Sequence, residues 1–204
     1  MNPLTSVKGT IVSSFVLALI VAFYFSTDSS SLFDEVGQRN FAIWLHALSG
    51  VTWVGLLYYF NFVQTPAMAE ALSDEGGPGP AAIGKYIAPK ALLWFRMAAA
   101  ATWLTGAWAL EMKYGFIDAF LFKTIYGASG DMIGLGAWLG TIMLFNVWVL
   151  IWPNQKKILG MVEASAEEIA KAKFTAAMAS RTNVVLSVPI LLCMIGAGQG
   201  GYLF

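Results

Sequence analysis

Five apolar segments, each long enough to cross a lipid bilayer, constrain the fold of this 204-residue chain more than any other feature. A helix needs about 20 mainly apolar residues to span the hydrocarbon core of a membrane. Hydrophobic residues make up 58% of the chain and charged residues 12%, too few to cover so much apolar surface in water. We therefore predict an all-α integral membrane protein, a single membrane domain (1–204) built as a bundle of about five transmembrane helices. The expected spans are residues 9–26, 40–65, 91–111, 132–152 and 182–202.

Lysine and arginine residues are distributed unevenly between the two sides of the predicted bundle. Positively charged loop residues collect on the cytoplasmic side of membrane proteins. We therefore expect a cytoplasmic N-terminus and, with five spans, a C-terminus on the outer side. The expected cytoplasmic side holds eight cationic residues, namely Lys8, Lys85, Lys90, Lys156, Lys157, Lys171, Lys173 and Arg181, and the outer side holds Arg39, Lys113 and Lys123.

The cytoplasmic stretch before the last span has the pattern of an amphipathic helix. Ser165-Ala-Glu-Glu168 has the spacing of a capping box, which pairs a serine and a glutamate at a helix start. We expect this helix to run into the last span, with Pro189 kinking it. In the fourth span, Gly136 and Gly140 have the small-xxx-small spacing that is typical of close helix contacts in membranes.

His46 is the chain's one histidine and lies inside the second expected span. At 3.6 residues per turn, His46, Gly50, Trp53, Leu57, Asn61 and Gln64 share one helical face. Imidazole is a frequent axial ligand of haem iron. One interpretation is a haem site with His46 as metal ligand, Gly50 leaving room for a flat group and Trp53 beside it. The other is a histidine that forms a hydrogen bond with a neighbouring helix.

Other polar residues at membrane depth have an ordinary interpretation beside a functional one, because such residues are costly and often functional. Arg39 either faces the propionates of a haem held by His46 or marks the outer end of its helix. Arg96 either reaches the cytoplasmic surface or pairs with a buried acceptor. For Asn146 we expect an interhelical hydrogen bond, with substrate contact as the alternative. The carboxylates expected on the outer side form either a metal site or a solvated surface, and they are Asp34, Glu35, Glu111, Asp118 and Asp131.

Several function classes do not fit the sequence. The net charge is zero and no basic run occurs, so we expect no nucleic-acid partner. The single cysteine, Cys193, supports neither a disulfide framework nor a cysteine metal cluster. One histidine within an apolar span does not provide a Ser-His-Asp or Cys-His nucleophile.

Three blocks of sequence resemble the membrane domain of the bacterial urate hydroxylase (membrane urate oxidase) family. The first is Trp44-Leu-His46 followed by Trp53-Val-Gly55-Leu-Leu-Tyr-Tyr-Phe60-Asn-Phe. The second is Ser180-Arg181-Thr182-Asn183-Val-Val-Leu186-Ser187-Val-Pro189, and the third runs from Trp138 to Trp148 and on through Trp152-Pro153-Asn154-Gln155. The Leu-His…Trp-x-Gly pattern is also similar to small membrane proteins of the protoporphyrinogen oxidase and copper-resistance type, some of which hold haem b through such a histidine.

The resemblance implies a protein of the bacterial inner membrane, linked to oxidation of urate to 5-hydroxyisourate. Long family members carry a C-terminal cytochrome c domain, whereas this sequence has no Cys-x-x-Cys-His motif. We therefore expect a short form that passes electrons to a separate acceptor, such as a cytochrome c. A six-coordinate haem b would need a second ligand, for which the candidates are Met112, Met132, Met194 or a second chain's histidine. Carrying the family blocks onto this chain adds Arg181, Asn183 and Ser187 to His46 and Trp53 as candidate site residues.

Two hypotheses for the function follow. The first is a membrane redox protein with haem b at His46. The second is a non-catalytic accessory subunit of a larger membrane complex, respiratory or photosynthetic, which the small size and sparse polar loops favour. Whether the chain is itself an enzyme stays open between them. The absence of an inverted repeat argues against a transporter.

Overall fold

The computed structural model describes residues 2–25 and 34–202, which contain helices and no strands. The predicted all-α membrane fold is therefore confirmed for this part of the chain. The described residues divide into two compact units, within 1–41 and 42–204. Residue 26, the last of the first expected span, lies outside the described residues.

The first unit contains a short 3₁₀ helix, a long apolar helix and the beginning of a third helix. The 3₁₀ helix starts with Pro3, and the side chain of Asn2 accepts a hydrogen bond from the backbone N–H of Leu4 over 2.9 Å. The long helix exposes its whole apolar surface, as expected for a segment that lies in lipid. These elements are η1 (Pro3–Thr5) and α1 (Val7–Phe25).

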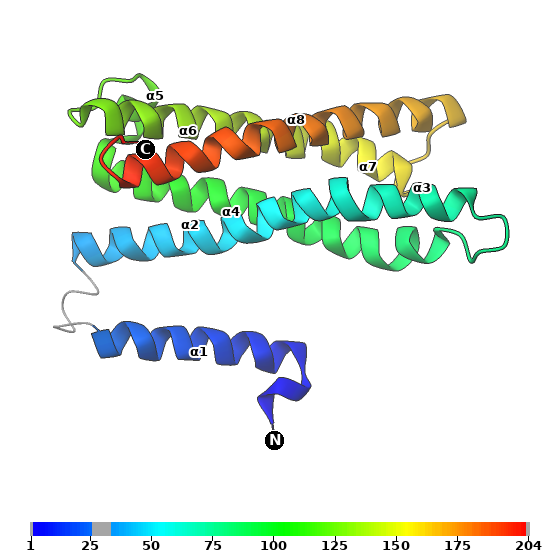
Figure 1. Cartoon of the computed structure of the whole chain (residues 1–204), viewed down its shortest axis with the longest axis horizontal. Coiled ribbons are helices and arrows are strands. Elements are labelled where there is room, and N and C mark those ends of the chain that lie inside the picture. Colours follow the sequence, from blue (N-terminus) through cyan, green and yellow to red (C-terminus); the bar gives the residue numbers. More distant parts are fainter. Residues whose placement is uncertain (1, 26–33, 203–204) are drawn as a thin grey trace. The chain divides into compact units, whose positions relative to one another are not determined.

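The second unit is a bundle of four long helices that alternate in direction along the chain (Figure 1). The first of these helices begins in the first unit. Short connections between antiparallel neighbours are typical of such bundles. The elements in chain order are α2 (Glu35–Tyr58), η3 (Tyr59–Gln64), α3 (Thr65–Ser73), η4 (Ile83–Ile87), α4 (Ala88–Tyr114), α5 (Phe116–Phe120), α6 (Gly127–Phe145), η5 (Asn146–Ile151), α7 (Trp152–Ile158) and α8 (Ala166–Gly198).

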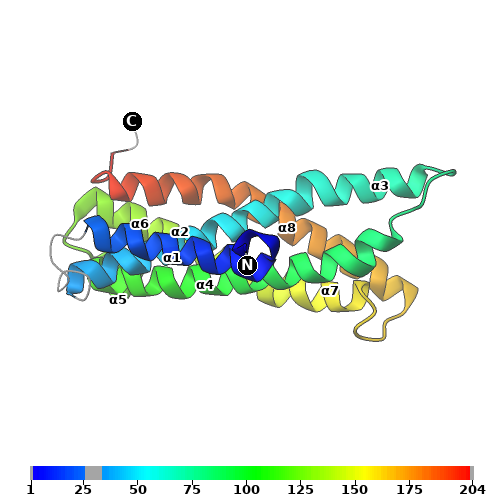
Figure 2. The same ribbon diagram turned by 90° about the horizontal axis from the view of Figure 1, so that it is seen from below.

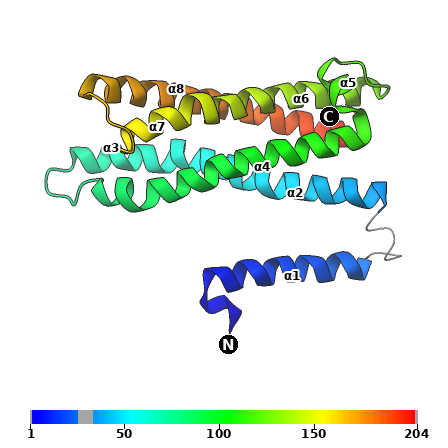
Figure 3. The same cartoon turned by 180° about the vertical axis from the view of Figure 1, so that it is seen from behind.

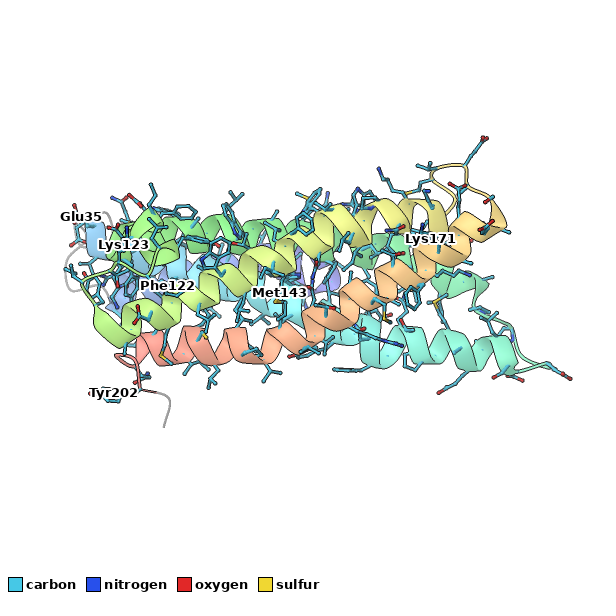
Figure 4. The ribbon with its side chains drawn as sticks, turned by 90° about the horizontal axis from the view of Figure 1, so that it is seen from above. Glu35, Phe122, Lys123, Met143, Lys171 and Tyr202 are labelled. Carbon is cyan, nitrogen blue, oxygen red and sulfur yellow. The ribbon has the colours of Figure 1, made fainter. Side chains whose placement is uncertain are left out.

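The two ends of the bundle are distinct. The α3–η4 loop lies at one end (Figure 2), and α5 lies with the C-terminal end of α8 at the other (Figure 3). Hydrogen bonds close the α5 end: Ser129 Oγ donates to the carbonyl of Ala197 over 2.8 Å, and Trp138 Nε1 donates to the carbonyl of Phe120 over 2.9 Å. Lys123 and Tyr202 lie at this end and Lys171 at the opposite one (Figure 4). The predicted topology also placed Lys123 and Lys171 on opposite sides.

Four helices in the described ranges are long and apolar enough to cross a membrane. The expected spans 40–65 and 132–152 lie wholly inside two of these helices, and most of 9–26 and of 182–202 lies inside the other two. The fifth, 91–111, forms most of α4 but is not among the four, because Arg96 and several threonine and tryptophan residues lower its mean hydropathy. Its crossing of the membrane stays a prediction, as does the single membrane domain. The four helices are Val7–Phe25, Glu35–Ser73, Gly127–Ile158 and Ala166–Gly198.

Three π-helical segments interrupt the long helices, and each lies just before a proline. η3, η4 and η5 are followed at the second position by Pro66, Pro89 and Pro153. Proline has no N–H to donate, and its ring clashes with the carbonyl four residues earlier in an α-helix. In each segment the residue before proline donates instead to the carbonyl five residues earlier, as Thr65 does to Phe60. The wider turn lets the helix continue through the proline.

α8 unites the expected amphipathic helix and the last span in one helix. The predicted capping box is confirmed: Ser165 Oγ accepts from the backbone N–H of Glu168 over 3.2 Å, and the Glu168 carboxylate accepts from the Ser165 N–H over 2.9 Å. The predicted glycine contact is confirmed as well. A Cβ on Gly136 would meet Cys193 Cβ at 3.2 Å, and one on Gly140 would meet Ile190 Cδ1 at 3.2 Å. Both glycines therefore let α6 and α8 approach closely.

Candidate cofactor site

A cavity of about 630 Å³ lies inside the bundle between α2, α4, α6 and α8. Ligand pockets usually measure about 300–1,000 Å³, so this one is large enough for a small-molecule ligand. It extends from the bundle centre, where Met143 is labelled in Figure 4, to the α5 end, at Tyr114 and Gly198. Most lining side chains are apolar, and none is an aspartate, glutamate, lysine or arginine. The cavity is therefore suited to an uncharged or weakly polar group.

His46 lines this cavity and is fixed by a hydrogen bond to α4. Its Nδ1 lies 2.7 Å from the backbone carbonyl oxygen of Thr102. A carbonyl oxygen only accepts hydrogen bonds, so Nδ1 carries the proton and donates it. In the neutral ring this leaves the lone pair on Nε2, the tautomer that metal-bound histidines adopt when the other nitrogen is held by the backbone. The hydrogen bond of the ordinary interpretation is thus present, and it leaves Nε2 able to bind a ligand.

Gly106 provides the space in which this imidazole lies. A Cβ at Gly106 would come within 2.7 Å of His46 Nδ1 and 2.8 Å of His46 Cε1. Non-bonded atoms do not approach a Cβ this closely, so a larger residue at position 106 would displace the imidazole ring. Thr102 and Gly106 are four residues apart on α4 and therefore lie on the same helical face. One face of α4 thus fixes the position of His46 on α2.

Trp53 carries the second polar group of interest at the cavity. Its side chain is 3% exposed and lines the cavity, and its indole Nε1 has no hydrogen-bond partner among the described residues. An unsatisfied buried donor is costly, and native structures contain few of them. Trp103, by contrast, donates its Nε1 to Thr141 Oγ1 over 2.9 Å. The free N–H of Trp53 is therefore a feature that a bound ligand could explain.

The cavity contains some of the expected site residues and not others. His46, Gly50 and Trp53 line it, as their shared helical face predicts. A Cβ on Gly50 would meet only Thr102 Cγ2, at 3.7 Å, so this glycine is not tightly enclosed. Arg39 does not line the cavity and belongs to residues 1–41, so its role stays a prediction. Of the three methionines proposed as a second ligand, Met194 lines the cavity, and Met112 and Met132 do not.

A second set of polar side chains connects α2, η3, η5 and α8 near the bundle centre. We call it the polar cluster, and it comprises Tyr58, Asn61, Asn146, Ser180, Asn183 and Ser187. Asn146 Nδ2 donates to Asn183 Oδ1 over 2.8 Å, which confirms the predicted interhelical hydrogen bond. The Tyr58 and Ser187 hydroxyls lie 2.8 Å apart, and Asn61 Nδ2 donates to Ser180 Oγ over 2.8 Å. Because its side chains satisfy one another across helices, the polar cluster fixes the helix register.

The comparison with known families concerns the C-terminal part of the chain, which contributes α6, η5 and α8 to the bundle. Residues 112–200 match the family model described as urate oxidase N-terminal. This part of the chain is similar to the urate oxidase N-terminal family. No curated protein and no solved structure matches the chain. The resemblance inferred from the sequence blocks is thereby confirmed for the matched range.

The urate oxidase N-terminal match covers two of the three sequence blocks. It includes α6, η5, α7 and α8, and with them Asn146, Asn183 and Ser187 of the polar cluster. His46 and Trp53 precede the matched range, so their carry-over from the family stays a prediction. Arg181 lies within it but is exposed, whereas Asn183 and Ser187 are fully buried. Arg181 therefore does not lie with the two buried residues in one site.

Removing the Asn183 amide should weaken the packing of α6 and η5 against α8. Asn183 Nδ2 also donates to the carbonyl of Met143 over 3.0 Å, so Asn183→Leu removes the acceptor of the buried Asn146 amide and one of the donors to the Met143 carbonyl. Each unpaired buried group costs about 1–3 kcal/mol. We expect a lower midpoint of thermal unfolding in detergent, followed by circular dichroism. Thr182→Val is the matched control on the exposed side of α8, and an equal midpoint in both variants would contradict a stabilising role.

Two of the charged residues singled out in the sequence make contacts outside the cavity. The Arg96 guanidinium carbon lies 3.8 Å from the ring centroid of Trp152, a contact that the sequence did not indicate, and the choice between its two expected roles stays a prediction. Glu111 Oε2 accepts a hydrogen bond from the Phe116 N–H over 2.7 Å, at the start of α5. Within the described ranges no three histidine, cysteine, aspartate or glutamate residues gather as they would around a metal ion.

Sequence reasoning missed Thr102 and Gly106, although both are needed to fix His46. The signal for Gly106 was a glycine within a predicted span, where it costs about 1 kcal/mol relative to alanine and needs a reason. For Thr102, whose contact uses a backbone carbonyl, no side-chain pattern could have indicated the partner. The π segments could have been expected from Pro66, Pro89 and Pro153, because each proline lies inside or beside a helical pattern and disturbs the helix before it.

Proposed function

We propose that the chain is a membrane redox protein of the urate hydroxylase type that holds haem b through His46 and passes electrons to a separate acceptor, such as a cytochrome c. The observation that carries this proposal is the hydrogen bond from His46 Nδ1 to the Thr102 carbonyl, which leaves Nε2 unprotonated at a large apolar cavity. A haem bound there would supply one-electron transfer.

The residues of the cavity fit axial ligation of a haem. His46 would be the ligand, and Met194 is the lining residue that could act as a second one. Gly50 and Gly106 add no side-chain volume beside the imidazole. No lysine or arginine lines the cavity, so the haem carboxylates would have to find their partners at its edge. The apolar lining would exclude water and favour the ferrous state of a haem, because its iron–porphyrin core carries no net charge.

The same lining argues against urate as the ligand of this cavity. Urate is a small anion with many hydrogen-bonding groups, and burying such a group without partners is costly. Apart from the His46 imidazole, the lining offers a few hydroxyl and indole groups and no cationic side chain. We therefore propose that the membrane part carries electrons derived from urate oxidation and that urate itself reacts elsewhere.

An ultraviolet–visible spectrum of the detergent-purified protein, oxidised and then reduced with dithionite, tests the proposal. We expect a Soret band and a sharp α-band on reduction, at about one haem per chain by pyridine haemochrome assay. Reduction of the band by urate in the presence of the native membrane would then link the haem to urate. A folded protein without any chromophore would refute haem binding and favour the accessory-subunit hypothesis.

A further inference from the structure

Arg96 of α4 is a half-buried cation that has no anionic partner among the described residues. Its guanidinium carbon lies 3.8 Å from the centroid of the Trp152 ring, and the side chain is half-buried. No hydrogen bond or ion pair of Arg96 occurs among residues 2–25 and 34–202, where the one ion pair joins Lys157 to Glu168. A guanidinium has five N–H donors and no acceptor. These donors are held at the ring by stacking and remain available to an anion.

A second cation shares the same indole. Lys156 Nζ lies 5.9 Å from the Trp152 centroid, one helical turn further along α7. Two positive charges near one ring repel each other unless an anion lies close to both. In the described part of the chain no carboxylate lies within ion-pairing distance of either. Two cations thus lie at one indole between α4 and α7, and the described residues supply no anion to either.

The position of this site indicates which anion it meets. Between Asp131 and Trp152 lie about 20 mainly apolar residues, the number that a helix needs to cross the hydrocarbon core. Trp152 thus lies where tryptophan is enriched, at the boundary between hydrocarbon and headgroups. The phosphates of lipids lie at this depth, and cationic pockets between helices on the cytoplasmic side bind anionic headgroups. Guanidinium binds phosphate oxygens in a bidentate manner and lysine binds them as a point charge.

We propose that Arg96, Trp152 and Lys156 form a binding site for the phosphate of an anionic phospholipid, such as phosphatidylglycerol or cardiolipin. Arg96 donates to the phosphate while stacked on Trp152, and Lys156 neutralises it from the side. The acyl chains lie along the apolar surface of the bundle. This site is independent of haem, because none of the three residues lines the cavity.

Native mass spectrometry of the full chain in detergent, titrated with phosphatidylglycerol or phosphatidylcholine, tests the site. We expect one phosphatidylglycerol to bind about tenfold more tightly than phosphatidylcholine, and Arg96→Gln to lose about tenfold in that affinity, the effect of one charge-assisted hydrogen bond. Lys156→Gln should lose a smaller factor. Lys171→Gln removes the same charge from an exposed position on α8 (Figure 4) and should bind as the unmodified chain does.

Three results would overturn the proposal. The first is equal affinity for the two lipids, and the second is Arg96→Gln binding phosphatidylglycerol as the unmodified chain does. The third is displacement of the lipid by inorganic phosphate at millimolar concentration, which would identify a site for free anions. If Arg96→Gln does not elute as a folded species in size-exclusion chromatography, Lys156→Gln and Arg96→Lys provide the comparison, and full affinity in both would count equally against the site.

Discussion

Replacing His46 by alanine should remove all bound haem from the protein. The substitution deletes the imidazole, whose Nε2 is left free by the hydrogen bond of Nδ1, and none of the other lining residues is a histidine, cysteine or lysine. A thioether such as that of Met194 is a weak ligand and is not expected to retain haem alone. The measurement is haem per chain by pyridine haemochrome assay after purification, with an expected loss of at least tenfold.

The control for this substitution is Leu48→Ala, two residues further along α2. Leu48 is exposed and does not line the cavity, so its truncation should leave the haem content unchanged. Imidazole added to His46→Ala during haem reconstitution should occupy the vacated space and restore the Soret band. Haem retained at full level in His46→Ala would disprove ligation by this residue.

Gly106→Ala should lower haem content while leaving the fold intact or slightly more stable. The added methyl group would lie within 2.8 Å of two imidazole atoms, so His46 must turn away from the Thr102 carbonyl. Substitutions of groups that orient a metal ligand typically lower metal affinity about 10–100-fold, and we expect a loss of that size here. Alanine is at the same time the better helix former by about 1 kcal/mol. Haem affinity and the thermal unfolding midpoint should therefore move in opposite directions.

Gly84→Ala separates the two effects. Gly84 lies in η4, where a Cβ would meet nothing within 4 Å, so this variant gains helix propensity without touching His46. It should keep its haem. If Gly106→Ala binds haem with unchanged affinity, the close approach of α4 to the imidazole has no part in ligand binding.

The helices and the buried face of the second span could be predicted from the sequence, because both depend on local patterns. The 3.6-residue period placed His46, Gly50 and Trp53 together, and all three line the cavity. The capping box at Ser165 and the glycine contact at Gly136 follow from spacing within one helix.

Contacts between helices could not be predicted, because they depend on rotation and on the depth of each helix relative to the next. The pairing of His46 with the Thr102 carbonyl joins residues 56 positions apart and uses a backbone atom that every residue has. The stacking of Arg96 on Trp152 likewise joins α4 to α7. The sequence predicts that Arg96 is costly in lipid but does not indicate the ring that shields it.

The π segments before Pro66, Pro89 and Pro153 have a consequence for how the two halves of the bundle relate. Each wide turn adds one residue to a helix, which rotates everything beyond it by about 100° relative to an uninterrupted helix. Each π segment therefore changes which side chains of its helix face the bundle interior. The half that encloses the cavity and the half beyond it can present different helix faces to their neighbours. Substitutions that tune the cationic end, at Trp152 or Lys156, need not disturb the phase that aims His46 and Trp53 inward.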